Sequence, residues 1–326
     1  MKAVFLRLSF VLLFFVAASP GQETSAPAPQ TTIRVNVDRV NVGVIVTGLH
    51  GQFVEGLHRE DFRILDNGVE QPITGFLPIA EPAQVLFLVE SGPAVFFLGR
   101  SHFQAAATLL NHLSPEDRVA IASYSKDPEL LLDFTSDKPS ARYALENLNF
   151  MAGFADLNLS SSLAAAIDWL VTLPGKKSVV VLSTGIDTSP PEKWPLIQQK
   201  LETADVRILA VSLSGDFRKP IKHKVLTAKE KQDRAIVKQG FAAADRSLRE
   251  LALATGGRVY FPKDQKAFDR AYAEIAQLVR HEYSLAFTPP AHDGQLHTIE
   301  VKMKGFARRV DFRQAYVAPG PSVSQP

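Results

Sequence analysis

Hydrophobic and polar residues follow two different patterns along this chain. Residues 33–40 alternate between apolar and polar positions, which is typical of a strand with one buried face. Residues 42–46 and 85–89 are instead continuously apolar, as expected for strands that are covered on both faces.

From residue 84 onward, predicted strands alternate with predicted helices. The strands cover residues 85–89, 118–124, 179–182, 206–213 and 259–261. The helices cover residues 102–113, 160–173 and 267–281. Residues 248–255 close a further helix that Gly256-Gly257 terminates, and one more begins at Ser189-Pro190-Pro191-Glu192. Repeated units of this kind predict an α/β fold, with a doubly wound, mainly parallel sheet of about six strands over residues 84–281.

Both ends of the chain are rich in strands. Asn67-Gly68 separates two strand-like runs, and this pair favours a tight hairpin turn. Residues 283–287, 297–303 and 309–312 also have the pattern of strands. We therefore expect the N-terminal segment 31–80 and the C-terminal segment 282–318 to form a small β-rich accessory module, followed by a disordered tail over residues 319–326.

The start of the chain has the pattern of an export signal. Lys2 and Arg7 precede an apolar run over residues 8–18, and small residues follow it. This order predicts a secretory signal peptide over residues 1–22 and a polar linker over residues 23–32. The apolar run is too short to span a membrane, and no second span is predicted. We expect a protein exported to the periplasm or the cell exterior.

Composition excludes some classes of chemistry. The chain has 326 residues, no cysteine and a net charge of +2, so neither disulfides nor a general attraction to nucleic acid or lipid is predicted. The segment 216–239 is locally basic and has little aromatic content for base stacking. It could attract an acidic partner, although a solvated loop and helix face is the simpler interpretation.

No motif indicates an enzyme. The chain lacks a Gly-x-Ser-x-Gly elbow, a Gly-x-x-x-x-Gly-Lys phosphate loop and a His-Glu-x-x-His zinc motif. His292 and His297 flank Gly294, which favours a turn over a metal site. We expect neither enzymatic activity nor a cofactor.

Ligands of open α/β sheets gather at the carboxyl ends of the strands. Three loops follow predicted strands or precede helices at that edge: residues 89–96, 150–160 and 183–190. Candidate site residues should therefore lie on these loops.

The loop motifs resemble the three site loops of a von Willebrand factor A domain. They are Ser91-Gly92 after an apolar strand, Gly153-Phe154-Ala155-Asp156-Leu157 before a helix, and Ser183-Thr184-Gly185-Ile186-Asp187-Thr188 after another strand. Further motifs resemble bacterial secreted proteins of the acidobacterial, von Willebrand factor A-related type over residues 31–318. They are Val37-x-x-Val-x-Val, Gly56-Leu57-x-x-x-Asp61-Phe62, Asp66-Asn67-Gly68 with Gln71, Gly256-Gly257-Arg258, and Glu282-Tyr283-Ser284-Leu285 through Thr288-Pro289-Pro290.

The resemblance implies a cation site that this chain has lost. Members with an intact site hold a divalent cation through an Asp-x-Ser-x-Ser loop, a threonine and a second aspartate, and the partner adds a carboxylate. The corresponding positions here are Val89, Ser91, Pro93, Ala155 and Thr184. Shifting the first loop by one residue places Glu90 at the acidic position, but Gly92 and Ala94 then replace the serines. Hard cations require an oxygen-rich shell that neither register supplies.

The expected function is protein–protein interaction without a cation. Candidate residues for partner binding are Glu90, Ser91, Phe96, Phe154, Asp156 and Asp187. The alternative hypothesis is a cation-dependent adhesin with a site rebuilt from Glu90, Asp156 and Asp187, which requires these carboxylates to converge. A hydrolase is a third hypothesis and requires a polar cleft with perturbed titratable groups.

Overall fold

The computed structural model describes residues 39–78, 82–93, 95, 101–150, 156–190, 192, 194–215, 227–305 and 309–320, and these belong to one compact unit. Several predictions lie outside the described residues. They are the signal peptide 1–22, the linker 23–32, the predicted strand up to residue 38, the candidates Phe96 and Phe154, the position Ala155, the basic residues at 218–224 and the tail from residue 321.

A six-stranded sheet runs through the middle of the described part of the chain, in the order β10-β9-β8-β5-β6-β7. Its strands are β5 (Ala83–Glu90), β6 (Arg118–Tyr124), β7 (Pro128–Thr135), β8 (Lys176–Ser183), β9 (Arg207–Ser212) and β10 (Arg258–Tyr260). All neighbours pair in parallel except β6 and β7, which are antiparallel. The predicted α/β fold with a mainly parallel sheet is confirmed, and β7 is an edge strand that the sequence pattern did not reveal.

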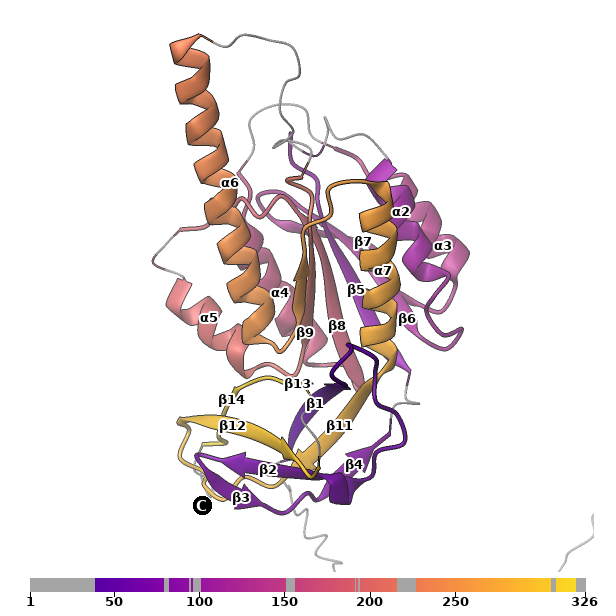
Figure 1. The fold of residues 1–326 in the computed structure, drawn as a ribbon, viewed down its shortest axis with the longest axis vertical. Coiled ribbons are helices and arrows are strands. Elements are labelled where there is room, and N and C mark those ends of the chain that lie inside the picture. Colours follow the sequence, from indigo (N-terminus) through magenta and orange to yellow (C-terminus); the bar gives the residue numbers. More distant parts are fainter. Residues whose placement is uncertain are drawn as a thin grey trace, which may run out of the picture. The chain divides into compact units, whose positions relative to one another are not determined.

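Helices cover both faces of this sheet (Figure 1). One face carries α2 (Ser101–Leu110), α3 (Lys138–Glu146) and α7 (Gln265–Arg280). The other carries α4 (Leu159–Leu170), α5 (Trp194–Thr203) and α6 (Ala228–Ala254). No helix within the described residues is both long enough and apolar enough to cross a membrane.

The continuous apolar run of β5 explains its central place. Val85, Phe87 and Val89 enter the core beneath α2 and α7, whereas Leu86 and Leu88 enter the core beneath α4 and α6. Successive side chains of a strand point to opposite faces, so only an unbroken apolar run can fill both cores. Full burial of each such side chain stabilises the fold by about 1.5–3 kcal/mol.

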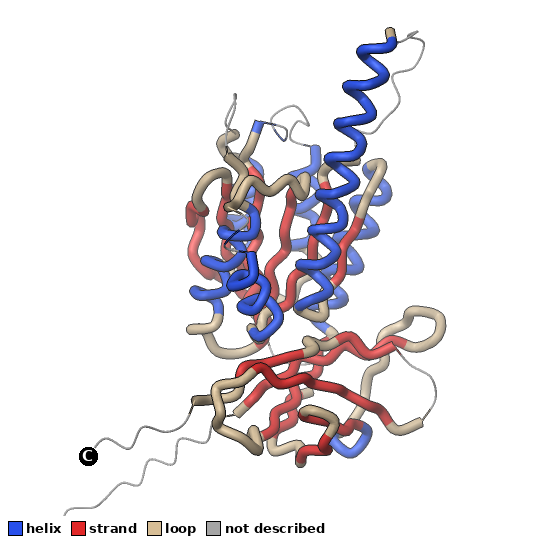
Figure 2. Tube along the Cα trace, turned by 90° about the vertical axis from the view of Figure 1, so that its left-hand side faces the viewer, coloured by secondary structure: helices blue, strands red, loops and turns tan. Residues whose placement is uncertain are grey.

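The two ends of the chain form a sandwich of two antiparallel sheets (Figure 2). Within the described residues, one sheet has the order β13-β1-β11-β4 and the other β14-β12-β2-β3. The N-terminal strands are β1 (Val40–Thr47), β2 (Phe62–Asp66), β3 (Val69–Gln71) and β4 (Gly75–Leu77), with a short 3-10 helix at Arg59–Asp61 before β2. The C-terminal strands are β11 (Glu282–Phe287), β12 (Leu296–Met303), β13 (Arg309–Asp311) and β14 (Ala315–Val317).

Each of these sheets mixes strands from both chain ends. β1 pairs with β11 and β13, and β2 pairs with β12. Side chains from both sheets, such as Val42, Ile64, Leu285 and Val301, share one buried core. The predicted accessory module from the two terminal segments is therefore present, as a sandwich with its own core.

The predicted hairpin joins β2 to β3 through two residues. Asp66 pairs with Val69, so Asn67 and Gly68 alone make the turn, with φ values of 46° and 80°. Both values are positive, which a type I′ turn requires and which asparagine and glycine adopt most easily.

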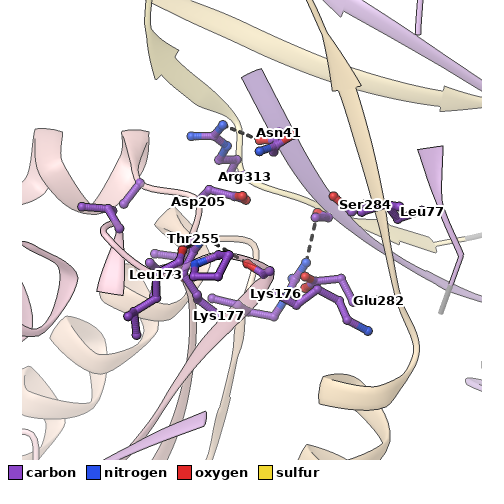
Figure 3. Close-up of a pocket in the computed structure, with 17 residues that line it drawn as sticks. Asn41, Leu77, Leu173, Lys176, Lys177, Asp205, Thr255, Glu282, Ser284 and Arg313 are labelled. Atoms are coloured by element: carbon purple, nitrogen blue, oxygen red, sulfur yellow. Dashed lines mark hydrogen bonds and ion pairs between the residues drawn. The ribbon is translucent and has the colours of Figure 1, made fainter. Parts of the chain in front are cut away.

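A buried arginine joins the sandwich to the amino end of the parallel sheet. Arg207 Nε lies 2.6 Å from Glu282 Oε2, and Nη2 donates to the carbonyl oxygen of Gly43 at 3.1 Å. Beside this pair lies a pocket of about 370 Å³, with Lys176, Asp205 and Arg313 in its wall (Figure 3). Arg313 donates to the carbonyl oxygens of Thr203 and Asn41, so guanidinium groups bridge the two parts of the unit here.

Candidate functional site

The carboxyl ends of β5, β6 and β8 meet at one edge of the sheet. The chain passes from β5 to β6 and β7 on one side, then returns to β8 on the other side of β5. Ligands of open α/β sheets bind at such a reversal of strand order. The first and third predicted site loops follow β5 and β8 and therefore lie side by side at this edge.

Glu90, the last residue of β5, fills the position between these loops. Its side chain is fully buried. Oε2 accepts hydrogen bonds from the Thr184 amide at 2.7 Å, from Thr184 Oγ1 at 2.8 Å and from Ser183 Oγ at 3.0 Å. Tyr124 Oη donates to Ser183 Oγ at 2.7 Å and lies 3.4 Å from the carboxylate. We call Glu90, Tyr124, Ser183 and Thr184 the Glu90 network.

Burial governs the ionisation of this network. Desolvation raises the pKa of Glu90, although the hydrogen bonds from Thr184, Ser183 and Tyr124 act in the opposite direction. Desolvation likewise raises the pKa of Tyr124, and the nearby Glu90 charge raises it further. Tyr124 therefore stays a neutral donor, and the carboxyl group is held by partners from β6 and from the third loop.

A tight backbone approach supports the third loop from the other side. Gly185 has a φ of 79°, and a Cβ atom there would lie 2.8 Å from the carbonyl oxygen of Ala244 on α6. Glycine is therefore required by both conformation and space. Ser183 Oγ also accepts a hydrogen bond from the Gly185 amide at 2.8 Å, which continues the Glu90 network into the loop.

Four of the positions that the resemblance aligns with cation ligands lie among the described residues. Val89 lies in the hydrophobic core, and Ser91 Oγ donates to the Tyr124 carbonyl oxygen at 3.0 Å. Pro93 is half-buried at the start of a helical turn, and Thr184 belongs to the Glu90 network. Glu90 rather than Val89 therefore supplies the acidic group of the first loop.

Asp187 and Asp156 are exposed, unlike Glu90. Asp187 Oδ2 accepts from the Ser160 amide at 3.0 Å, and Oδ1 accepts from the Ser189 amide at 2.9 Å. Asp187 thus satisfies an amide in the first turn of α4 and one in its own loop, as a capping residue does. Among the described residues, no three His, Asp or Glu side chains are placed to hold a metal ion, so the three carboxylates of the rebuilt-site hypothesis do not converge.

An open groove of about 780 Å³ adjoins the Glu90 network. It begins at Ser91 and Ser123 and runs between β7 and α3. We call it the β7–α3 groove, and its described lining is Ser91, Ser123, Ser125, Asp127, Glu129, Leu131, Leu132, Pro139, Ser140, Tyr143, Ala144, Asn147, Asn149 and Phe150. Most of these residues lie on β7, on α3 or just after α3, two elements that the sequence pattern did not predict. In the sequence, the apolar run Leu130-Leu131-Leu132 between charged residues was the feature that could have indicated strand β7.

Comparison with known protein families finds a similarity in one part of the chain. Residues 100–186 match the von Willebrand factor type A domain. No curated protein sequence matches the chain.

Three solved structures illustrate the likeness. A von Willebrand factor type A protein of Catenulispora acidiphila is 12% identical, with a TM-score of 0.47 over 81% of this chain and 74% of that one. The BatB protein of Bacteroides thetaiotaomicron is 13% identical, with a TM-score of 0.37 over 60% and 99%. The PilB minor pilin of Streptococcus sanguinis is 12% identical, with a TM-score of 0.44 over 64% and 63%. Residues 100–186, within the α/β part of this chain, are therefore similar to the von Willebrand factor type A domain.

Proposed function

We propose that this protein is an exported, non-enzymatic interaction module that binds a partner protein without a bridging cation. The observation that carries the proposal is the Glu90 network. It occupies the strand ends at which a member of this family with an intact site would hold its ion.

The direction of the hydrogen bonds in the network argues against a cation. A divalent ion needs several oxygen atoms that point their lone pairs into one open space. Here an amide and two hydroxyl groups point their hydrogens at Glu90. A cation would have to displace these donors and leave the Thr184 amide buried without an acceptor, which costs about 1–3 kcal/mol.

The β7–α3 groove supplies the surface for a partner. Tyr143 is 71% exposed and Leu131 is 40% exposed, and both line the groove. Exposed aromatic and aliphatic residues beside a concave surface are the usual anchors of a protein interface. Export is supported by the signal-peptide pattern of residues 1–22.

Thermal unfolding tests the absence of a cation. The mature chain is melted in EDTA and then with Mg²⁺, Ca²⁺ or Mn²⁺ at matched ionic strength. A site with a Kd of about 0.1 mM, in about 10 mM cation, would gain roughly 2.7 kcal/mol of stability. That gain would raise the melting temperature by about 5–10 °C. We expect no shift, and a shift of that size would overturn the proposal in favour of a cation-dependent adhesin.

Capture from the exporting cell tests the interaction itself. Wild type, Tyr143→Asp and Leu49→Asp serve as cross-linking baits in the presence of EDTA. Leu49 is a matched control, because it is 77% exposed but lies outside the groove. We expect one protein to be captured by wild type and by Leu49→Asp but not by Tyr143→Asp. Capture that requires a divalent cation, or that survives Tyr143→Asp, would contradict the proposal.

A further inference from the structure

We propose that the free edge of β7 binds an extended segment of a partner protein in which basic and apolar side chains alternate. This inference rests on the proposed function and names the chemistry of the partner at the β7–α3 groove.

Strand β7 is the last strand at one side of its sheet. It pairs with β6, and outside that ladder no backbone group of residues 129–132 is bonded to another backbone group of the described residues. Most of the strand is exposed to solvent. Since an edge strand presents a row of unpaired N–H and C=O groups, a further strand can pair with it about 4.8 Å away.

The β7–α3 groove lies along one face of this edge. Asp127, just before β7, and Glu129 both line the groove, as expected for side chains two positions apart on an extended chain. Leu131 and Leu132 are neighbours, yet both line it as well. The register with β6 is irregular at this point, and a bulge redirects side chains in this way. A strand added to the edge would therefore place alternate side chains over the same groove.

The charges along this face are acidic. Asp127 and Glu129 are exposed, and neither takes part in an ion pair among the described residues. No Lys, Arg or His belongs to the described lining of the groove. Side chains opposite each other on neighbouring strands lie about 5 Å apart, so basic side chains of an added strand would lie beside these carboxylates.

Apolar groups complete the surface. Leu130 is 51% exposed, Leu131 is 40% exposed, and Tyr143 of α3 is 71% exposed. Apolar side chains of an added strand would cover the two leucines and remove them from water. The ring of Tyr143 can in addition contact the cationic group of an arginine. The surface thus fits a strand that is both apolar and basic, rather than one that is basic alone.

A second copy of this chain does not fit the same edge. Pairing two β7 strands would bring Glu129 and Asp133 of one copy near those of the other, and β7 holds no basic residue to offset them. Like charges on neighbouring strands are destabilising, and charged residues commonly prevent edge-to-edge association. The same charges that oppose self-pairing attract a basic strand from another protein.

Binding of a labelled peptide to the mature chain tests the inference. The probe is a short fluorescein-labelled peptide of alternating valine and arginine, and fluorescence anisotropy measures its binding. We expect saturable binding that weakens at high salt, and no binding of the matched peptide with glutamate in place of arginine.

Two variants locate the binding site. Glu129→Lys should weaken binding about tenfold or more, whereas Glu250→Lys, at an exposed carboxylate outside the groove, should leave it unchanged. Unchanged melting temperatures will show that both variants are folded. Binding that survives Glu129→Lys contradicts the inference.

Methylation of the peptide nitrogens separates strand pairing from charge attraction alone. Alternate N–H groups of a strand point to the same edge, so methylating the arginine nitrogens blocks one edge of the peptide and methylating the valine nitrogens blocks the other. We expect one methylated peptide to bind and the other to fail. Equal behaviour of the two, or no binding of the unmethylated peptide, overturns this inference. Either result leaves the proposed function standing, because that proposal is decided by the response to cations and by capture of another protein.

Discussion

Glu90 and Thr184 are joined by a hydrogen bond of 2.7 Å from the Thr184 amide to Glu90 Oε2. The bond connects the end of β5 to the loop after β8, between the two central strands of the sheet. An acidic side chain at this edge thus serves as an internal brace between loops. Its energetic role can be measured directly.

Glu90→Ala should lower the free energy of unfolding by about 2–4 kcal/mol, because it leaves the Thr184 amide and two hydroxyl groups buried without their acceptor. Urea unfolding measures the change. Asp156→Ala, an exposed carboxylate at the same edge, should stay within about 0.5 kcal/mol of wild type. Equal stability of Glu90→Ala and wild type would show that the network does not brace the loops.

Asp187→Ala should destabilise the protein by about 1 kcal/mol, because the Ser160 amide near the start of α4 loses its acceptor. Asp187→Asn is the matched variant, since an asparagine oxygen can accept the same hydrogen bond, and it should behave nearly like wild type. Chemical denaturation of both variants measures whether Asp187→Asn is more stable than Asp187→Ala. If both substitutions lower the free energy of unfolding equally, the carboxylate acts by its charge rather than as a cap.

Arg207→Met should destabilise the protein by about 3–5 kcal/mol, because it leaves the buried Glu282 carboxylate without its ion-pair partner. The double variant Arg207→Met, Glu282→Leu removes both charges and should recover part of that loss. Denaturant unfolding of the two variants gives the comparison. A double variant that is no more stable than the single one would mean that packing, not the unpaired charge, sets the cost.

His297 should make stability depend on pH. It lies buried in the sandwich, with Nδ1 2.8 Å from Asp66 Oδ1 and Nε2 3.2 Å from Asp293 Oδ2. Burial lowers the pKa of His297, but the two carboxylates outweigh it, so the folded pKa lies above the unfolded value of 6.5. The protonated form is therefore favoured by folding.

The sign of the dependence follows from this shift. The contribution of His297 to stability is complete below pH 6.5 and is lost as pH rises through the higher folded pKa. Melting temperatures from pH 5.5 upward should fall more steeply in wild type than in His297→Gln. His50→Gln, at an exposed histidine, should keep the wild-type slope. Parallel curves for wild type and His297→Gln would refute the assignment.

The sequence by itself determined the elements whose signals are local. The apolar run of β5 requires cover on both faces, and Asn67-Gly68 permits the positive φ values of the hairpin turn. The end of α6 just before Gly256 and the strands at both chain ends were likewise predictable, because turn chemistry and two-residue periodicity are local properties.

Only the tertiary structure decided what the site residues do. Glu90 could be a ligand, a partner contact or a brace until Tyr124 and Ser183, from two other strands, were placed around it. Edge strand β7 escaped prediction because it is exposed along most of its length and so lacks the alternation that burial imposes. The pairing of His297 with Asp66 joins residues more than two hundred positions apart. Such contacts depend on how the two chain ends fold together, and no local pattern of side chains encodes them.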